Sequence, residues 1–175
     1  YASVGVGSLY HLLGAHFAQT IGAQMTHVPY KGGAPAITDL AGDQVDVSFI
    51  VVGDALMALA QQGRLKVLAT LAPAGKVEAA FLKGVPSINE SKSVRDFVFN
   101  TWTGYFVRKD TPEPVVQALN KAFTAAIGDP EVKVQIEKLG GSVPPMMTLD
   151  EAAKVYESQT ARFRAIAKAI KLEAQ

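Results

Sequence analysis

Apolar and polar positions alternate with a helical period near the start of the chain and along most of its last third. The first such stretch predicts a helix from Leu9 to Thr20, because its apolar residues recur every three or four positions and form one buried stripe. Ser8 can cap the N-terminus of this helix, and Gly22 follows its end, as helix termini prefer.

Five further helices are predicted from the same period and from residues that favour helix termini. Asp129 followed by a proline opens a short helix, and Thr148 with Glu151 three positions later forms a capping-box pattern before the last one. The last helix ends in a segment rich in Lys and Arg, which suits the negative end of the helix dipole. The predicted ranges are 34–40, 54–62, 111–127, 129–139 and 149–169.

Short apolar runs between the helices predict strands. Residues 45–52 and 65–71 are rich in β-branched side chains, and such continuous apolar runs are typical of strands buried on both faces. Residues 26–30 and 97–109 add two further strands. Because strands and helices alternate at short intervals, we predict an α/β fold with a mostly parallel sheet flanked by helices.

The character of the chain changes once and divides its 175 residues into two parts. Residues 1–104 have the α/β pattern of one complete lobe, whereas residues 105–175 are almost entirely helical. This length suits one domain or two small lobes. The chain begins at Tyr1 and runs straight into a glycine-rich turn, so we expect it to be a fragment of a longer protein.

Composition excludes several classes of function. The 17 Lys and Arg residues against 16 Asp and Glu leave a net charge of +1, so the charge does not favour nucleic acid as a partner. The absence of cysteine excludes disulfides and thiol catalysis. The longest apolar stretch, 45–60, is interrupted by Asp46, Gly53 and Asp54, and no transmembrane segment is predicted.

The glycine-rich segment Ser3–Ser8 is the first candidate binding site. Gly5 and Gly7 let backbone N–H groups approach a ligand, the following helix N-terminus contributes partial positive charge, and Ser8 adds a hydroxyl. These groups suit a carboxylate, a phosphate or a sulfate. A tight strand-to-helix turn without a ligand is the alternative. A dinucleotide-binding fingerprint fits poorly, because Tyr10 occupies the third glycine position.

A second glycine turn, at Tyr30–Gly33, follows a predicted strand and precedes a helix. Tyr30 places an aromatic hydroxyl, and Lys31 an ammonium group, beside the backbone N–H groups of Gly32 and Gly33. In a parallel sheet both glycine turns lie at the carboxyl ends of strands, where ligands of such folds bind. The alternative for Lys31 is a solvated loop lysine.

The histidines form no recognisable catalytic or metal-binding motif. His11 and His16 are five residues apart and do not share one helical face, so we expect no metal and no cofactor. Ser8 and His11 lie one helical turn apart and could form a serine–histidine pair, although the sequence contains no nucleophile elbow. We expect a structural role for all three histidines, His27 included.

Several motifs, in order along nearly the whole chain, resemble one family of transport receptors. The most specific is the run His27-Val28-Pro29-Tyr30-Lys31-Gly32-Gly33. The others are Gly5–Leu12, Gly42–Val47, Gly63–Ala69, Val85–Glu90, Trp102–Gly104 and Asp129–Val132. The chain resembles the tripartite tricarboxylate transporter substrate-binding proteins, also called Bug receptors or TctC-like proteins.

This resemblance implies a periplasmic solute-binding protein with the two-lobed fold of type II periplasmic binding proteins, and not an enzyme. Such a receptor captures a small di- or tricarboxylate between its lobes without a cofactor and delivers it to the membrane permease subunits of the transporter. The residues that match the family's ligand-binding loops are Ser3, Gly5, Gly7, Ser8, His11, Tyr30, Lys31, Gly32 and Gly33.

The resemblance also implies that part of the receptor lies outside this chain. Residues 1–104 correspond to the second lobe, and residues 105–175 to the helices that return to the first lobe, whose N-terminal part is absent. We therefore expect the isolated chain to bind carboxylates weakly or not at all. We also expect it to form homo-oligomers through the surface that the absent segment would cover.

One departure from the family pattern concerns specificity. Phe49 is followed by Ile50, where family members often carry an Asp. If that Asp reads the distal end of the ligand, its loss favours a plain dicarboxylate over an amino acid.

Three other functions remain open. The glycine-rich turn could serve a nucleotide-binding enzyme, or Ser8 and His11 a hydrolase, in which case a Ser8→Ala variant would lose turnover. A regulatory effector-binding domain would share the two-lobed fold, but no helix-turn-helix segment is visible in the sequence. The chain could also be a truncated remnant that only folds and self-associates.

Overall fold

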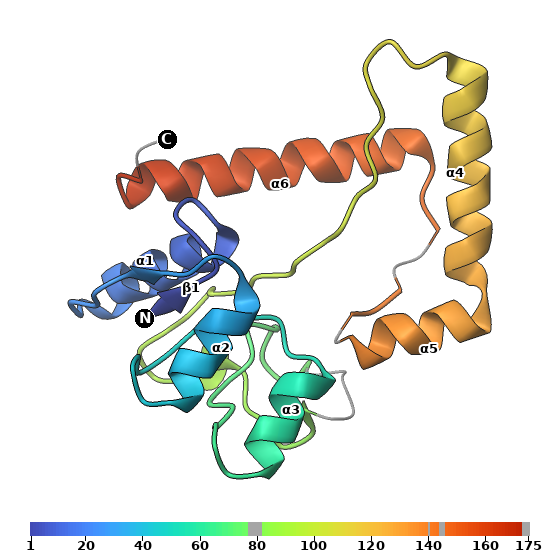
Figure 1. The fold of residues 1–175 in the computed structure, drawn as a ribbon. Helices are drawn as coiled ribbons and strands as arrows, with labels where there is room; N and C mark the ends of the chain where they lie inside the picture. Colours follow the sequence, from blue (N-terminus) through green and yellow to red (C-terminus); the bar gives the residue numbers. More distant parts are fainter. Residues whose placement is uncertain (77–81, 140, 144–145, 173–175) are drawn as a thin grey trace.

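The computed structural model describes residues 1–76, 82–139, 141–143 and 146–172. Figure 1 shows an N-terminal part, which contains β1, α1, α2 and α3, joined by an extended segment to the C-terminal helices α4, α5 and α6. Helix α6 returns across α1, so the end of the chain packs on its beginning. The α/β class predicted from the sequence is confirmed.

Local sequence signals set the ends of helix α1 (Leu9–Ile21). The Ser8 hydroxyl caps the helix by accepting a hydrogen bond from the His11 backbone N–H at 3.3 Å. Gly22 ends it with a φ of 67°, a left-handed conformation that glycine adopts without strain. The predicted helix 9–20 is therefore confirmed to within one residue.

The regular sheet of the described residues consists of two short parallel strands. Strand β1 (Ala2–Ser3) pairs with β2 (Val28–Pro29), in a register that places Ala2 opposite Val28. Parallel neighbours need a crossover connection, and α1 supplies it. The carboxyl ends of β1 and β2 consequently lie at the same edge of the sheet.

Three of the predicted strands are wrong as regular strands. Residues 45–52 and 65–71 contribute one isolated parallel bridge each, through Ser48 and Thr70, and residues 97–109 have extended backbone without strand pairing. Strand preference depends on packing against neighbouring strands, and these segments lack a repeating ladder along their length. Leu68, for example, is 64% exposed, although the sequence predicted burial on both faces.

Helices α2 (Gly33–Ala41) and α3 (Asp54–Gln61) confirm two predicted helices. Helix α2 packs on β1 and is preceded by Gly32, whose φ of 108° only glycine adopts readily. A 3-10 helix, η2 (Ile88–Glu90), follows further along and carries its own capping box from Ser87.

Two hydrophobic clusters form the core. The smaller one joins Ala2, Ala36 and Val45, and so packs β1 against α2. The larger one is built around aromatic and branched side chains and also holds α6. Its buried members are Leu13, Val94, Phe97 and Phe99, with Leu9, Phe17, Phe49, Leu71, Ile88, Phe163 and Ile166 packed against them.

The last three helices, α4 (Glu113–Gly128), α5 (Pro130–Lys138) and α6 (Leu149–Ala169), confirm the predicted helical C-terminal part. Helix α6 is tied to the α/β part by Arg162, which donates a hydrogen bond to the Val98 carbonyl and lies 4.6 Å over the Phe99 ring. Helix α4 stands away from α1 and α2 at the end of the extended segment (Figure 1).

Aromatic side chains are exposed where the extended segment meets α4 and α6. Tyr105 and Phe106 are each 70% exposed, and Tyr105 stacks on Phe123 with ring centres 4.4 Å apart. We call this surface the aromatic face. Its members are Trp102, Tyr105, Phe106, Phe123 and Tyr156.

Candidate functional site

The first glycine turn joins the buried end of β1 to helix α1. The Ser3 hydroxyl is buried; it donates to the Gly5 carbonyl at 3.0 Å and accepts from the Gly5 N–H at 3.2 Å. Gly5 and Gly7 have φ values of 146° and 76°, which side chains other than glycine's rarely allow. The shape of this predicted site therefore depends on both glycines.

The side chains of Ser8 and His11 have separate partners within this turn. The Ser8 hydroxyl donates to the Gly5 carbonyl at 2.7 Å and accepts from the His11 backbone N–H. The ring of His11 instead accepts the Gly7 N–H at Nδ1, at 3.2 Å. The hydrogen bond that a serine–histidine nucleophile requires is not among these contacts.

The second glycine turn lies directly beside the first. The Tyr30 N–H donates to the Ser3 carbonyl at 2.9 Å, because β1 and β2 are parallel neighbours. Gly32 caps α2 without any side-chain hydrogen bond to the first N–H groups of that helix, which begins at Gly33. The N-termini of α1 and α2 thus lie at one edge of the sheet, as the sequence predicted.

Tyr30 supports the second turn through its side chain. Its hydroxyl donates a hydrogen bond to the Asp39 carboxylate of α2 at 2.8 Å, which links the turn to that helix. Desolvation, this hydrogen bond and the charge of Asp39 together raise the pKa of the Tyr30 hydroxyl. Lys31, beside it, is exposed to solvent.

His27 is the residue that sequence reasoning missed. Its Nε2 lies 2.6 Å from the Ser3 hydroxyl oxygen, and its ring stacks on that of His11 with centres 3.7 Å apart. One signal was its place at the head of the specific motif His27–Gly33. The contacts themselves depend on the pairing of β1 with β2, which the sequence does not reveal.

Both stacked histidines are held in their neutral forms. Desolvation lowers the pKa of His11, and desolvation, the His11 ring and the amino terminus lower the pKa of His27 to about 4. The two rings are therefore uncharged at neutral pH, and the turn offers backbone dipoles in place of full imidazolium charges. A carboxylate can be held by such N–H groups at helix N-termini.

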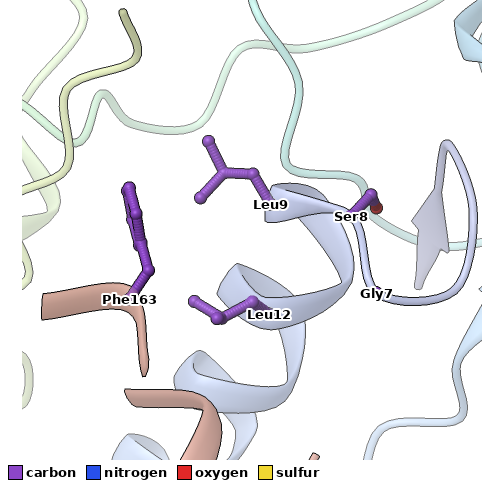
Figure 2. Close-up of a pocket in the computed structure, with 5 residues that line it drawn as sticks. All are labelled: Gly7, Ser8, Leu9, Leu12 and Phe163. Carbon is purple, nitrogen blue, oxygen red and sulfur yellow. The ribbon is translucent and has the colours of Figure 1, made fainter. Parts of the chain in front are cut away.

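A pocket of about 210 Å³ opens beside the first turn. Figure 2 shows Leu9 and Leu12 of α1 facing Phe163 of α6 across it, whereas the Ser8 hydroxyl points away. Gly7 and Ser8 of the turn also line it. A mostly apolar pocket thus adjoins the first turn.

Residues 1–76, 82–139, 141–143 and 146–172 lack two other kinds of site. Within those ranges, His, Cys, Asp and Glu do not gather in groups of three or more that could hold a metal ion. No helix in the described part of the chain has both the length and the apolar character needed to cross a membrane.

The fold defines the class, which is that of the periplasmic binding proteins. The periplasmic binding protein BugD matches with a TM-score of 0.83 and 28% identity, over 99% of this chain and 57% of BugD. Residues 1–172 match the family described as the tripartite tricarboxylate transporter family receptor. The chain therefore belongs to this receptor family, which confirms the resemblance drawn from its motifs.

Two further solved structures come from Rhodopseudomonas palustris. One, with adipate, has a TM-score of 0.84 and 25% identity. This match covers 98% of our chain and 56% of the adipate-bound chain. The other, MatC with bound malate, has a TM-score of 0.81 and 25% identity. This match covers 94% of our chain and 55% of the MatC chain.

A curated relative from Pseudomonas sp. (strain P51), the UPF0065 protein in the tcbD-tcbE intergenic region, is 31% identical over 168 residues. The match covers 94% of this chain and 47% of the relative. The chain thus spans about half the length of this and other curated relatives.

Proposed function

We propose that the chain supplies a carboxylate-binding lobe of a periplasmic receptor that captures a small di- or tricarboxylate between two lobes. The observation that carries this proposal is the contact between the two glycine turns, from the Tyr30 N–H to the Ser3 carbonyl at 2.9 Å. This contact brings the N-termini of α1 and α2 to the same edge of the sheet. The N–H groups at helix N-termini favour the binding of anions.

The nine residues named from the sequence divide into two roles in this proposal. Gly32 and Gly33 supply backbone N–H groups to the carboxylate, and Lys31 supplies an exposed ammonium. Gly5 and Gly7 donate their N–H groups to Ser3 and His11 and so give the first turn its shape. The other four hold the turns in shape through their side chains. These are Ser3, Ser8, His11 and Tyr30.

We infer a dicarboxylate with an aliphatic chain as the ligand class. Solved relatives with adipate and with malate support this class. The apolar pocket beside Gly7 supports it as well, since Leu9, Leu12 and Phe163 suit methylene groups next to a bound carboxylate. A net charge of +1 is compatible with anion binding by amides, which needs no large excess of basic residues.

We further propose that the receptor works in the periplasm and delivers its ligand to the membrane permease subunits of a tripartite transporter. The family's description and the periplasmic relative BugD support this role. We propose no catalysis, because Ser8 and His11 direct their side chains to separate backbone partners in the turn.

The complete receptor in this proposal has a further N-terminal half. Residues 1–104 form its ligand-binding lobe, and residues 105–175 return to the other lobe. The proposal is supported by the 47% of the Pseudomonas relative that the chain covers, and by the aromatic face, whose exposed rings would gain from being covered. An isolated chain then covers this face by pairing with a second copy.

The test is a titration of the ¹⁵N-labelled chain with malate and with adipate, followed at the amides of Gly5, Gly7, Gly32 and Gly33. We expect resonance shifts at these amides and weak affinity, because tight binding in two-lobed receptors requires closure around the ligand. The diol with the carbon chain of adipate is the uncharged control and should leave the amides unmoved.

Two outcomes would count against separate parts of the proposal. Unchanged turn amides with either acid would contradict the assignment of the site. Micromolar affinity of the isolated chain, measured by calorimetry, would contradict the need for the second lobe.

A further inference from the structure

Three aromatic rings form a stack beside the first glycine turn. The Tyr1 ring lies 5.0 Å from the His27 ring, at an interplanar angle of 26°. The His27 ring lies 3.7 Å from the His11 ring, and their planes differ by 7°. His27 thus lies between Tyr1, which precedes β1, and His11 of α1, the two elements that the turn connects.

Each imidazole is linked to a different glycine of the turn. His27 Nε2 is 2.6 Å from the Ser3 hydroxyl, which bonds both the N–H and the carbonyl of Gly5. His11 Nδ1 accepts the N–H of Gly7 at 3.2 Å. The stacked pair therefore connects to the turn at two points that flank Val6.

The hydrogen bonds of the turn constrain the protonation of these rings. The Ser3 hydroxyl has one proton: depending on the His27 tautomer, it donates this proton to the Gly5 carbonyl and accepts from Nε2–H, or donates it to an unprotonated Nε2. His11 Nδ1 accepts from Gly7 and must carry no proton. Protonation of His11 at Nδ1 would therefore break its contact with Gly7.

The titratable groups that face the pair reinforce its neutral state. They are the two imidazoles themselves, the Tyr1 hydroxyl, which donates to the His11 carbonyl, and the Tyr1 amino group, which donates to the Thr26 carbonyl. If both rings were protonated, two imidazolium charges with ring centres 3.7 Å apart would repel each other strongly, because burial partly desolvates both rings.

We propose that His27 is a positioning residue of the anion-binding turn: with His11 it forms a neutral stacked pair that holds Gly5 and Gly7 in place. The relevance of this role to ligand capture rests on the proposed function. The hydrogen bonds to the turn do not, so the proposal can be tested without any ligand.

The first test is a pH titration of the ¹⁵N-labelled 175-residue chain by NMR, in which the three imidazoles and the glycine amides are followed together. We expect the Gly7 amide resonance to move with the same midpoint as the His11 ring, below the ordinary histidine value. His16, whose pKa is also lowered by desolvation and by the charge of Arg162, lies outside the stack, and the Gly7 amide should not follow its titration. A Gly7 amide that does not respond while His11 titrates would overturn the proposal.

The second test compares two substitutions of His27 at neutral pH. His27→Phe keeps a ring for stacking but cannot bond Ser3, and we expect the Gly5 amide to exchange with solvent at least about tenfold faster. His27→Gln can place an amide N–H near the position of Nε2, and we expect partial rescue of that protection.

The Gly22 and Gly42 amides, which bond carbonyls within their own helix ends, are the controls. We expect both variants to leave them at the parental exchange rate. Equal Gly5 exchange in the parent and in His27→Phe, with these controls unchanged, would show that His27 only fills space.

Discussion

Gly32 and Gly33 are adjacent in the sequence but meet different physical demands. Gly32 has a φ of 108°, whereas Gly33 begins α2 with ordinary helical backbone. A Cβ built on Gly32 meets no atom within 4 Å, so an alanine there would suffer from backbone strain alone. A Cβ on Gly33 makes only an ordinary contact, 4.0 Å from the Ile50 side chain.

We therefore expect Gly32→Ala to reduce the free energy of unfolding by about 1–3 kcal/mol. It should also weaken the shifts that malate causes at the turn amides, since the α2 N-terminus would move. Gly33→Ala is the matched control and should be neutral or stabilising by up to about 1 kcal/mol. Chemical denaturation followed by circular dichroism measures both. Equal destabilisation by the two variants would contradict the role assigned to the backbone of Gly32.

The histidines give the chain a predictable dependence of stability on pH. The pKa of His27 is lowered from 6.5 in a solvated state to about 4 in the folded chain, and that of His11 is lowered too. Between these two values the unfolded chain binds a proton at His27 that the folded chain does not. Stability is consequently full above about pH 6.5 and falls as the pH drops toward 4.

We expect the Tm to decrease by several degrees over this acid range, as measured by thermal melts at constant ionic strength. Replacing His27 by Gln should flatten part of the slope, because the proton uptake by the unfolded chain is then removed. A Tm that rises on acidification from pH 6.5 would contradict the neutral state of the stacked pair.

At the scale of elements, α6 shows how a local signal supports a long-range contact. Thr148 and Glu151 form a reciprocal capping box: the Thr148 N–H donates to the Glu151 carboxylate at 2.8 Å, and the Glu151 N–H donates to the Thr148 hydroxyl at 3.2 Å. Helix α6 then carries Phe163 and Ile166 onto the larger core cluster. The cap stabilises a helix that holds the two parts of the chain together.

We expect Thr148→Ala to cost about 1 kcal/mol of folding free energy, the usual effect of removing a capping side chain. Ser158→Ala, in the interior of the same helix, is the control and should be neutral, because its hydroxyl donates to the Val155 carbonyl of that helix and not to a helix terminus. Hydrogen exchange at the first turn of α6 locates the effect. Faster exchange throughout α6 in the control variant as well would contradict it.

The capping box also adds an acid-sensitive contribution. The hydrogen bonds from Thr148 lower the pKa of Glu151 below 4.5. Its stabilisation of α6 is therefore present above that value and is lost as the pH falls through the lower pKa of the folded chain.

At the scale of the molecule, the aromatic face dominates the expected solution behaviour. Trp102, Tyr105 and Phe106 lie on backbone without strand pairing and are 40–70% exposed. We expect the isolated chain to self-associate through this face, with a mass that rises with concentration in light scattering. Added salt should not weaken the association, because apolar contacts drive it.

A paired substitution tests which surface is responsible. Tyr105→Ser with Phe106→Ser removes the two most exposed rings of this face and should shift the chain toward monomer while preserving its helical content. Met146→Ser, at an exposed apolar residue outside the face, is the control and should leave the mass unchanged. A monomeric parent chain at high concentration would contradict the proposal.

The sequence predicted much of the candidate site, with one omission. Both glycine turns, their flanking helices and their shared edge followed from local signals and from the rule for parallel strands. The sequence predicts a structural role for His27 and does not reveal its contacts with Ser3 and His11, which lie 24 and 16 positions away in the chain. Its role became visible only when the strand register was known.

Local signals in the sequence by themselves determined the helices of this protein and the place of its turns. Caps, glycines and helical periodicity act within a few residues, so no distant neighbour is needed to specify them. The tertiary structure alone decided which apolar runs became paired strands, which aromatic rings stayed exposed and which histidine reached the turn. Those outcomes depend on partners far away in the chain, because strand pairing and burial are properties of neighbours in space.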